Sequence, residues 1–424
     1  MKFPAYPEYK DSGIKSLGMV PSHWVVIPAK YKIRTLSGGQ TTKNKVSDEY
    51  AEGLYPAFSA SGQDVWMEDY EFNAEGVVLS AVGARCGKTF KANGKWGVVA
   101  NTHCLFPAKD VSRDYLWWLT NNEDWWEKGG TAQPFVKVSD SLARKIAFPN
   151  LQEQIVISHF LDHETKKIDE LIYEQEQLIE LLKEKRQSII SNAVCRGLDP
   201  NVPMKDSGVA WLGMIPEHWQ LTRLGRVTSA INDINHEMPE SVAEGIPFLS
   251  AKDLDDYGNL NFDNDVKLIS EADYQRLSQK ICPEKGDIIY SRYGTIGRAA
   301  IVKTDRKFLV SYSCCVIKIR RDDIALDYLR DLLSSDLILT ESRTRIRSMG
   351  QPDLGLAEIR RFPITLPPIK EQIAIDKFLK NEITEIDALM REALKASQLL
   401  QERRSALISA VVCGQIDVRN FHGN

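Results

Sequence analysis

The chain has 424 residues, of which 43% are hydrophobic and 26% are charged, and its net charge is −4. This length predicts two or three domains, and the composition is typical of a globular protein. No apolar run approaches the roughly 20 residues that cross a bilayer, and the N-terminus lacks the apolar core of a signal peptide. We therefore expect a cytoplasmic protein without a membrane partner. Seven cysteines without a CxxC pair favour reduced thiols over disulfides or a zinc site.

The first recognisable segment recurs later in the chain. KDSGIKSLGMVPSHW (residues 10–24) matches KDSGVAWLGMIPEHW (residues 205–219) at ten of fifteen positions. Identity of this extent within one chain indicates an internal duplication.

The rest of the first half reads as a mixed domain over residues 1–150. VVLSAVG (77–83) and GVVANTHCLF (97–106) carry β-branched residues between turn residues, as strands do. RDYLWWLTNNEDWW (113–126) has helical spacing. We expect a compact domain that contains both strands and helices.

A long helix is predicted over residues 151–199. Glu153 lies in its first turn, where negative charge is favourable, and Gly197 follows the last apolar position. Apolar residues recur at steps of three and four, as in a coiled-coil seam: Ile168, Leu171, Leu178, Leu182 and Ile189. The stretch from Ile168 to Val194 would span about 40 Å, close to one turn of DNA.

The second half repeats this plan with different interior residues. Strands are expected in GDIIYSR (286–292) and RKFLVSYSCCVIKI (306–319), and a helix in LDYLRDLLSSDLIL (326–339), within a domain over residues 200–368. A second long helix is predicted over residues 369–424, with apolar positions at Ile386, Leu389, Leu400 and Leu407.

The helix ends repeat as well. PNLQEQIVISHFL (149–161) matches PPIKEQIAIDKFL (367–379) at seven of thirteen positions, and residues 181–199 match 399–417 at nine of nineteen. Two amphipathic helices would each expose an apolar stripe, so we expect them to pack against each other. The chain thus keeps a repeated frame and varies its interiors, which favours one scaffold with two recognition surfaces.

We identify no catalytic residues and no metal site. GARCGKT (83–89) resembles a phosphate-binding loop, but Gly83 is one residue too close to Gly87, so a turn between strands is favoured. His159 and His163 lie four apart on the first long helix but lack the glutamate of a metalloprotease motif. We interpret them as surface histidines.

Basic and amide residues gather in the two interiors and are candidate DNA contacts. Arginine can bridge guanine O6 and N7, and glutamine can pair with adenine. If ESRTRIRSMGQPD (341–353) is extended, its three arginines share one face. The candidates are Arg85, Lys88, Lys91, Lys95, Gln133, Arg292, Tyr293, Arg298, Arg343, Arg345, Arg347 and Gln351.

The repeated segments resemble the specificity subunit of type I restriction–modification enzymes. The resemblance rests on SGIKSLGMVPSHW with its copy SGVAWLGMIPEHW, on the PNLQEQIVISHFL and PPIKEQIAIDKFL starts, and on the RQSIISNAVCRGLD and RRSALISAVVCGQID ends. It covers nearly the whole chain except the two interiors.

This resemblance implies a fold and a set of partners. The fold is mixed α/β (α+β), with two target recognition domains joined by two long antiparallel helices in a pseudo-twofold repeat. The chain would have no catalysis or cofactor of its own, and each domain would read half of a split, asymmetric site in double-stranded DNA. Two modification subunits would bind the helices and bring S-adenosylmethionine for adenine methylation. Restriction subunits would use ATP and Mg.

Two other functions remain open from the residues alone. One is a coiled-coil scaffold whose two variable lobes bind proteins. The other is a nucleotide-dependent enzyme that uses the GARCGKT loop, for which we expect no ATP binding.

Overall fold

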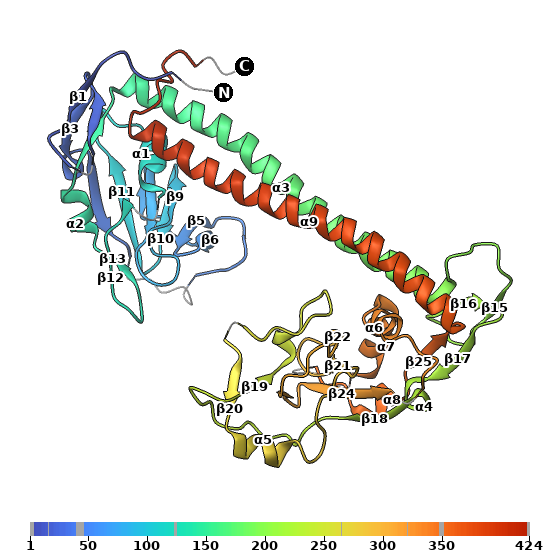
Figure 1. The fold of residues 1–424 in the computed structure, drawn as a ribbon. Helices are drawn as coiled ribbons and strands as arrows, with labels where there is room; N and C mark the ends of the chain where they lie inside the picture. The colour runs from blue at the N-terminus through green and yellow to red at the C-terminus, as the bar shows by residue number, and fades with distance from the viewer. Residues whose placement is uncertain are drawn as a thin grey trace. The chain divides into compact units, whose positions relative to one another are not determined.

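The chain forms two compact units, each of which contains a mixed sheet-and-helix domain and parts of both long helices (Figure 1). Unit 1 comprises Met1–Glu176 and Lys395–Asn424, and unit 2 comprises Gln177–Leu394. The predicted division into two domains and two separate helical segments differs from these units, because each long helix begins in one unit and ends in the other. The computed structural model describes residues 4–15, 17–39, 46–122, 125–263, 265–319, 321–346 and 352–421.

The unit 1 domain is built on two four-stranded sheets, with strand orders β4-β11-β8-β9 and β6-β5-β10-β7. Helix α1 (Arg113–Thr120) packs on the first sheet, and α2 (Val138–Ala143) lies near the short helix η1 (Ala29–Tyr31). The strands are β1 (Tyr9–Asp11), β2 (Met19–Pro21), β3 (Val25–Pro28), β4 (Ile33–Ser37), β5 (Tyr55–Ser59), β6 (Gly62–Met67), β7 (Phe72–Asn73), β8 (Gly76–Ser80), β9 (Thr89–Ala92), β10 (Lys95–Val98), β11 (Thr102–Pro107), β12 (Lys128–Gly129), β13 (Phe135–Val136) and β14 (Lys145–Phe148).

The unit 2 domain has the corresponding sheets, with orders β18-β24-β21-β22 and β20-β19-β23. Its strands are β15 (Met204–Asp206), β16 (Met214–Pro216), β17 (Gln220–Arg223), β18 (Thr228–Asn232), β19 (Ile246–Leu249), β20 (Lys267–Ile269), β21 (Ile288–Ser291), β22 (Ala299–Ile301), β23 (Leu309–Val310), β24 (Cys314–Ile319) and β25 (Pro363–Leu366). Its helices are α4 (Leu224–Val227), η4 (Ala251–Asp253), α5 (Glu271–Leu277), α6 (Leu326–Leu333), α7 (Asp336–Arg345) and α8 (Leu356–Arg360).

The two domains share one topology although their sequences have diverged. In the first sheet of each, a central strand that is buried at every residue, β8 or β21, pairs with β11 or β24 and with β9 or β22, always antiparallel. In the second sheet, β5 pairs parallel with β10, as β19 does with β23. The duplication seen in the frame therefore extends through the variable interiors.

Several predicted elements are divided in the structure. The run 97–106 becomes β10 and β11, separated by Asn101 with a φ of 68°, a left-handed conformation that ends a strand. The run 306–319 likewise becomes β23 and β24. The helix predicted over 113–126 ends at Thr120, and the one over 326–339 is replaced by α6 and α7.

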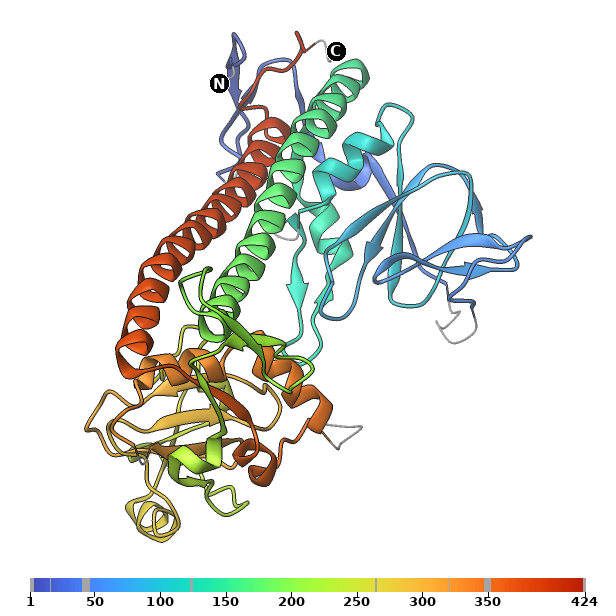
Figure 2. The same cartoon turned by 90° about the vertical axis from the view of Figure 1, so that its right-hand side faces the viewer.

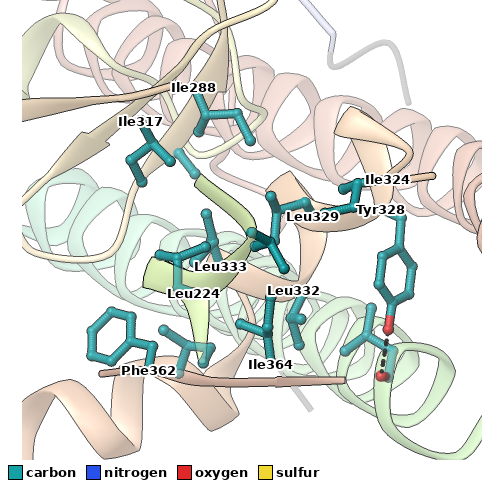
Figure 3. Close-up of a cluster of buried hydrophobic side chains, with 14 of the residues drawn as sticks. Leu224, Ile288, Ile317, Ile324, Tyr328, Leu329, Leu332, Leu333, Phe362 and Ile364 are labelled. Carbon is teal, nitrogen blue, oxygen red and sulfur yellow. Dashed lines mark hydrogen bonds between the residues drawn. The ribbon is translucent and has the colours of Figure 1, made fainter. Parts of the chain in front are cut away.

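Helix α6 supplies much of the unit 2 core. Its apolar face packs between the first sheet and strand β25, as Figure 3 shows with Leu329, Leu332 and Ile364 pointing into one cluster. Tyr328 lies at the edge of this cluster, and its hydroxyl donates to the carbonyl oxygen of Val194 on the long helix α3 (Leu151–Arg196) at 3.1 Å. The domain is thus anchored to α3 by both apolar and polar contacts.

The long helices are α3 (Leu151–Arg196) and α9 (Ile369–Val412). Both begin at the predicted residue, but α3 ends before residue 199 and α9 ends well before residue 424. In unit 1 the beginning of α3 and the end of α9 lie side by side (Figure 2), and Arg404 donates to Asp169 at 2.7 Å. In unit 2 Arg186 donates to Asp387 at 3.2 Å. Asp387 and Arg404 are the repeat equivalents of Asp169 and Arg186, so the aspartate of each copy binds the arginine of the other copy.

The predicted seam is only partly correct. Ile168, Leu182, Ile386 and Leu407 are buried, and Ile189 and Leu400 are half-buried. The prediction that all these leucines pack between the helices is wrong at three positions. Leu171, Leu178 and Leu389 are 45%, 42% and 51% exposed.

In unit 1 the repeated Glu-Gln dipeptide of α3 binds the repeated segment at the start of the domain. Trp24 Nε1 and the Tyr6 hydroxyl both donate to Glu153 Oε1, at 3.0 and 2.7 Å, and His23 Nε2 lies 2.8 Å from Glu153 Oε2. Gln154 donates to the carbonyl oxygens of Asp110 and Pro149. The first turn of α3 therefore fixes both the N-terminal hairpin and the connection before α1.

Unit 2 repeats these contacts with one difference. His218 Nε2 lies 2.9 Å from Glu371 Oε2, and Gln372 donates to the carbonyl oxygens of Asp323 and Pro367. Trp219, however, is buried and its Nε1 has no partner among the described residues. The equivalent glutamate thus holds three side chains in unit 1 and one in unit 2.

Unit 1 is completed by the C-terminal segment. The Asp417 amide donates to the Pro4 carbonyl oxygen at 2.8 Å, Val418 is buried, and the Phe421 ring packs on Phe160. In unit 2 the equivalent connection is covalent, since α3 continues into β15. Pro4 and residues 417–421 therefore contact each other and α3 within unit 1.

Candidate nucleic-acid interface

A turn with two glycines joins β8 to β9 in unit 1. The Ser80 amide donates to the Lys88 carbonyl oxygen, and the Gly87 amide donates to the Ser80 carbonyl oxygen, both at 2.9 Å. Gly83 and Gly87 have φ values of 97° and 100°, which favour glycine. Because the turn connects two strands and no helix follows it, the segment is not a phosphate-binding loop. The sequence prediction of a turn between strands is confirmed.

Unit 2 contains the same turn between β21 and β22. The Ser291 amide donates to the Arg298 carbonyl oxygen at 2.9 Å, and the Gly297 amide donates to the Ser291 carbonyl oxygen at 3.1 Å. Gly297 has a φ of 100°, which favours glycine at this position, and a Cβ there would also meet the Leu339 side chain. Lys88 and Arg298 occupy equivalent positions. We call these two segments, residues 80–88 and 291–298, the glycine turns.

Each glycine turn is hydrogen-bonded to a segment from later in the chain that follows a glutamine. We call these segments, Pro134–Phe135 in unit 1 and Pro352–Asp353 in unit 2, the Gln-Pro segments. In unit 1 the Gly83 amide donates to the Pro134 carbonyl oxygen at 2.8 Å, and Val82 bridges Phe135. In unit 2 the Gly294 amide donates to the Pro352 carbonyl oxygen at 3.1 Å, and Tyr293 bridges Asp353. Sequence reasoning matched the two Gln-Pro dipeptides, and the structure adds that Pro134 and Pro352 each lie against a glycine turn.

The unit 1 candidates form two groups. Arg85 and Lys88 are exposed on the glycine turn, and Gln133 is exposed directly before the Gln-Pro segment. Lys91 and Lys95 lie on the neighbouring strands: Lys91 Nζ is 3.1 Å from Asp114, and Lys95 Nζ lies 4.8 Å from the Tyr70 ring centroid. The second group is held by neighbouring side chains, and in the first group Arg85 Nη1 donates to the Ser61 carbonyl oxygen at 3.5 Å.

Arg292 requires a correction, because its side chain is buried and serves the fold. Its guanidinium is paired with Asp233 Oδ2 at 3.4 Å and Asp353 Oδ1 at 2.6 Å, and it donates to the Leu354 carbonyl oxygen at 2.9 Å. It therefore fastens the Gln-Pro segment to the sheet and cannot itself reach a ligand. The neighbouring Tyr293 is partly exposed.

The condition for an arginine stripe, an extended segment, is not met at Arg343 and Arg345. Arg343 and Arg345 lie in the last turn of α7, so alternate positions do not share one face. Arg345 is bound to Glu341 and to Glu358, the latter at 2.8 Å, while Arg343 is exposed. Arg347 and Gln351 lie outside the described residues.

A second surface of interest follows the long helices. Three exposed apolar positions carry the same residue in both repeats: Ile155 and Ile373, Leu171 and Leu389, and Leu181 and Leu399. Exposed apolar side chains that recur at equivalent positions form the same surface twice, once in each unit. The sequence pattern placed Leu171 and Leu389 on the helices but could not separate them from the buried seam.

Other classes of site find no support in the described part of the chain. No group of three or more potential metal ligands occurs there. His159 is exposed, and His163 lies 3.1 Å from Glu164, so the two act as surface residues. Among the described residues, no helix is both long and apolar enough to cross a membrane.

Comparison with known proteins decides the family. The family described as the type I restriction modification DNA specificity domain matches residues 33–181 and 216–396, one stretch in each half. The chain belongs to this family. It is a DNA-specificity component of a type I restriction–modification system, a non-catalytic role. The two matched stretches contain the two glycine turns.

Specificity subunits from an archaeon and a bacterium are among the relatives. The MjaVIII specificity subunit of Methanocaldococcus jannaschii is 23% identical over 437 residues, which cover 98% of each chain. The EcoBI specificity subunit of Escherichia coli is 22% identical over 278 residues, 64% of this chain and 58% of that one. A chain from a structural study of type I R-M complex assembly and conformational transition aligns with a TM-score of 0.62 at 14% identity, covering 93% and 98% of the two chains. This likeness supports the predicted fold.

Proposed function

We propose that each unit reads one half of a split, asymmetric site in double-stranded DNA. The observation that carries this proposal is the repeated glycine turn with its Gln-Pro segment, a frame that presents different side chains in the two units. Contacts to base edges depend on such side chains, whereas a shared frame gives both domains the same approach to the duplex. The remaining candidates for contact are Arg85, Lys88, Gln133, Tyr293, Arg298 and Arg343, together with Arg347 and Gln351, which lie outside the described residues.

The same proposal includes the partners of the complex. Two modification subunits would supply S-adenosylmethionine for adenine methylation, and restriction subunits would use ATP and Mg, with this chain binding no cofactor. The complex would act in the cytoplasm, on cellular DNA.

The exposed helix residues support a partner that binds twice. Two equivalent surfaces within one chain can bind two copies of one partner protein. Leu171 with Leu399 in unit 1, and Leu389 with Leu181 in unit 2, are exposed leucines of this kind. We therefore assign the modification subunits to these helix faces.

A map of N6-methyladenine in the host genome, with and without this chain, tests the DNA-reading role. We expect methylation to disappear at one split motif, two short half-sites separated by a gap of fixed length. Replacing residues 25–148 with the matching segment of a relative should change one half-site and leave the other unchanged. An unchanged map, in a strain where the modification subunits are produced, would contradict the proposal.

Substitutions on the helix faces test the partner assignment. We expect Leu171→Glu to reduce the complex from two modification subunits to one, because a buried carboxylate opposes apolar contact, and Leu389→Glu to do the same at the other site. Native mass spectrometry of the assembled complex measures the stoichiometry. Tyr173→Arg is the matched control, since Tyr173 is 61% exposed and its repeat equivalent is Arg391. Full assembly of both leucine variants would overturn the assignment.

The near-neutral charge of the chain adds an expectation about DNA affinity. Phosphate attraction grows with the number of basic contacts, and this chain has a net charge of −4. We expect weak DNA binding by the isolated chain and tighter binding by the complex. If the chain were instead a protein scaffold, neutralising Lys88 and Arg343 together would leave methylation unchanged.

A further inference from the structure

Arg298 is held in a fixed orientation at the end of the unit 2 glycine turn. Its Nε donates to Asp256 Oδ1 at 2.7 Å, and its Nη1 donates to the Leu254 carbonyl oxygen at 2.9 Å. The Arg298 amide also donates to Ser291 Oγ at 2.9 Å, which fixes the backbone beneath the side chain. Two of the three guanidinium nitrogens thus have partners, and Nη2 has none among the described residues.

The Arg298 side chain is 28% exposed. It borders a hollow of about 170 Å³ that is also lined by Thr295 of the turn, by Asp255 and Asp256, and by Arg186 of α3. A planar guanidinium that is already oriented loses little conformational entropy when it binds a second flat group. Its most favourable partner in the DNA major groove is guanine, which presents two acceptors on one edge.

The equivalent residue in unit 1 has the opposite character. Lys88 is exposed, and no ion pair or side-chain hydrogen bond is found for it within the described residues. A lysine ammonium is a compact charge on a flexible chain, which suits a phosphate better than a particular base. The same turn therefore carries an oriented arginine in one unit and an unrestrained lysine in the other.

We propose that Arg298 reads a guanine in the half-site of unit 2, with Asp256 as the residue that positions it. Lys88 contacts the phosphate backbone at the equivalent place in unit 1. This inference rests on the proposed DNA-reading function. It adds which residue at the repeated turn selects a base and which one supplies sequence-independent attraction.

The experiment uses the full complex of this chain with its modification subunits. Plasmid libraries are randomised one position at a time across the mapped motif, and methylation of each sequence is counted. For wild type we expect a guanine at one position of the second half-site to be preferred by roughly ten- to a hundredfold. Arg298→Gln should remove that preference and leave the other positions unchanged.

Two further variants separate base reading from a structural role. Asp256→Asn, a change at a side chain that is 73% exposed, should weaken the preference at the same position by a fewfold while the complex still assembles. Lys88→Gln should lower methylation equally for all sequences and reduce its salt dependence. Arg298→Lys keeps the charge and tests whether the guanidinium fork is needed, which we expect.

The possible failures are distinguishable. If wild type methylates no split motif, the proposed function and this inference both fail. If wild type has a motif but Arg298→Lys and Asp256→Asn leave every base preference unchanged, the inference alone is overturned. A uniform loss at all sequences with these two variants would mean that Arg298 only stabilises the turn, which also overturns it.

Discussion

In each unit the equivalent helix of the domain, α1 or α6, lies next to a long helix, but the side chains at the two junctions differ. Helices α1 and α6 both carry Asp-Tyr-Leu in their first turn, and then diverge: Trp117 and Trp118 in unit 1 correspond to Arg330 and Asp331 in unit 2. In unit 1, Trp118 Nε1 donates to Asp162 Oδ1 on α3 at 3.1 Å. Lys91 Nζ lies 4.6 Å from the Trp117 ring centroid.

The unit 2 junction reverses the charge on the long helix. Arg330 is paired with Asp331 at 2.7 Å, and Lys380 of α9 lies 3.3 Å from Asp327. Lys380 is the repeat equivalent of Asp162. A change in the domain is thus accompanied by a change in the helix that supports it, at positions where Asp162 and Lys380 are 47% and 54% exposed. The repeat preserves the positions of the equivalent residues and the topology of the domains, while the side chains at each junction are specific to that unit.

We expect the largest difference in lost stability between the units when the repeated glutamate, Glu153 or Glu371, is replaced. Glu153→Ala would leave the buried Trp24 Nε1 and Tyr6 hydroxyl without a partner, each at a cost of about 1–3 kcal/mol. Glu371→Ala removes only a partly exposed contact with His218. We expect unit 1 to lose about 3 kcal/mol or more and unit 2 less than about 1 kcal/mol.

Hydrogen exchange of the intact protein, followed separately for peptides from unit 1 and from unit 2, measures the loss of stability in each unit. Glu153→Gln is the control, since its amide oxygen can still accept one of the hydrogen bonds. Equal losses in the two units would contradict the asymmetry.

A smaller difference is expected in the pH dependence of stability. Burial raises the pKa of Asp331 to about 6, and this outweighs the opposing charge of Arg330. The native state therefore holds this proton more tightly than the unfolded chain, whose carboxyl titrates near 3.8. The free energy of unfolding of unit 2 should fall as pH rises from about 4 to 6, and remain lower above that range.

Asp331→Asn should remove this dependence and stabilise unit 2 at pH 7.5 by about 1–2 kcal/mol, within the roughly 3 kcal/mol that such a pKa shift represents. Unfolding monitored in unit 2 at pH 4.5, 6 and 7.5 measures the effect. Unit 1 has Trp118 at the equivalent position, so its exchange rates act as the internal reference. Parallel pH profiles for wild type and Asp331→Asn would rule the effect out.

The smallest effect concerns the two equivalent ion pairs between the long helices. The side chains of Arg186 and Asp387 are 14% and 13% exposed, whereas those of Arg404 and Asp169 are 30% and 52% exposed. Less solvent screening should make the coupling in unit 2 about 1 kcal/mol and that in unit 1 a few tenths. Double-mutant cycles with alanine at each pair measure both couplings, and raising the salt concentration should weaken the unit 1 pair more. A stronger coupling between Arg404 and Asp169 would refute this ordering.

Local sequence signals predicted the elements but not always their ends. The strand pattern of residues 97–106 did not reveal the break at Asn101, because a single left-handed residue leaves the surrounding apolar pattern unchanged. The arginines at 343 and 345 would share a face only on an extended segment, whereas α7 includes both of them. Alternation of three residues is too short a pattern to separate strand from helix.

The sequence by itself determined the duplication, the two long helices, the absence of a recognisable catalytic motif and the family, because repeats and amphipathic periodicity are properties of residue order. Only the tertiary structure decided which equivalent residues of the two repeats make the same contacts. It buried Arg292, exposed Leu171 and Leu389, and oriented Arg298 through Asp256. Burial and hydrogen-bond partners depend on side chains that are distant in sequence, such as Glu153 and Trp24, and no local pattern records which of them meet.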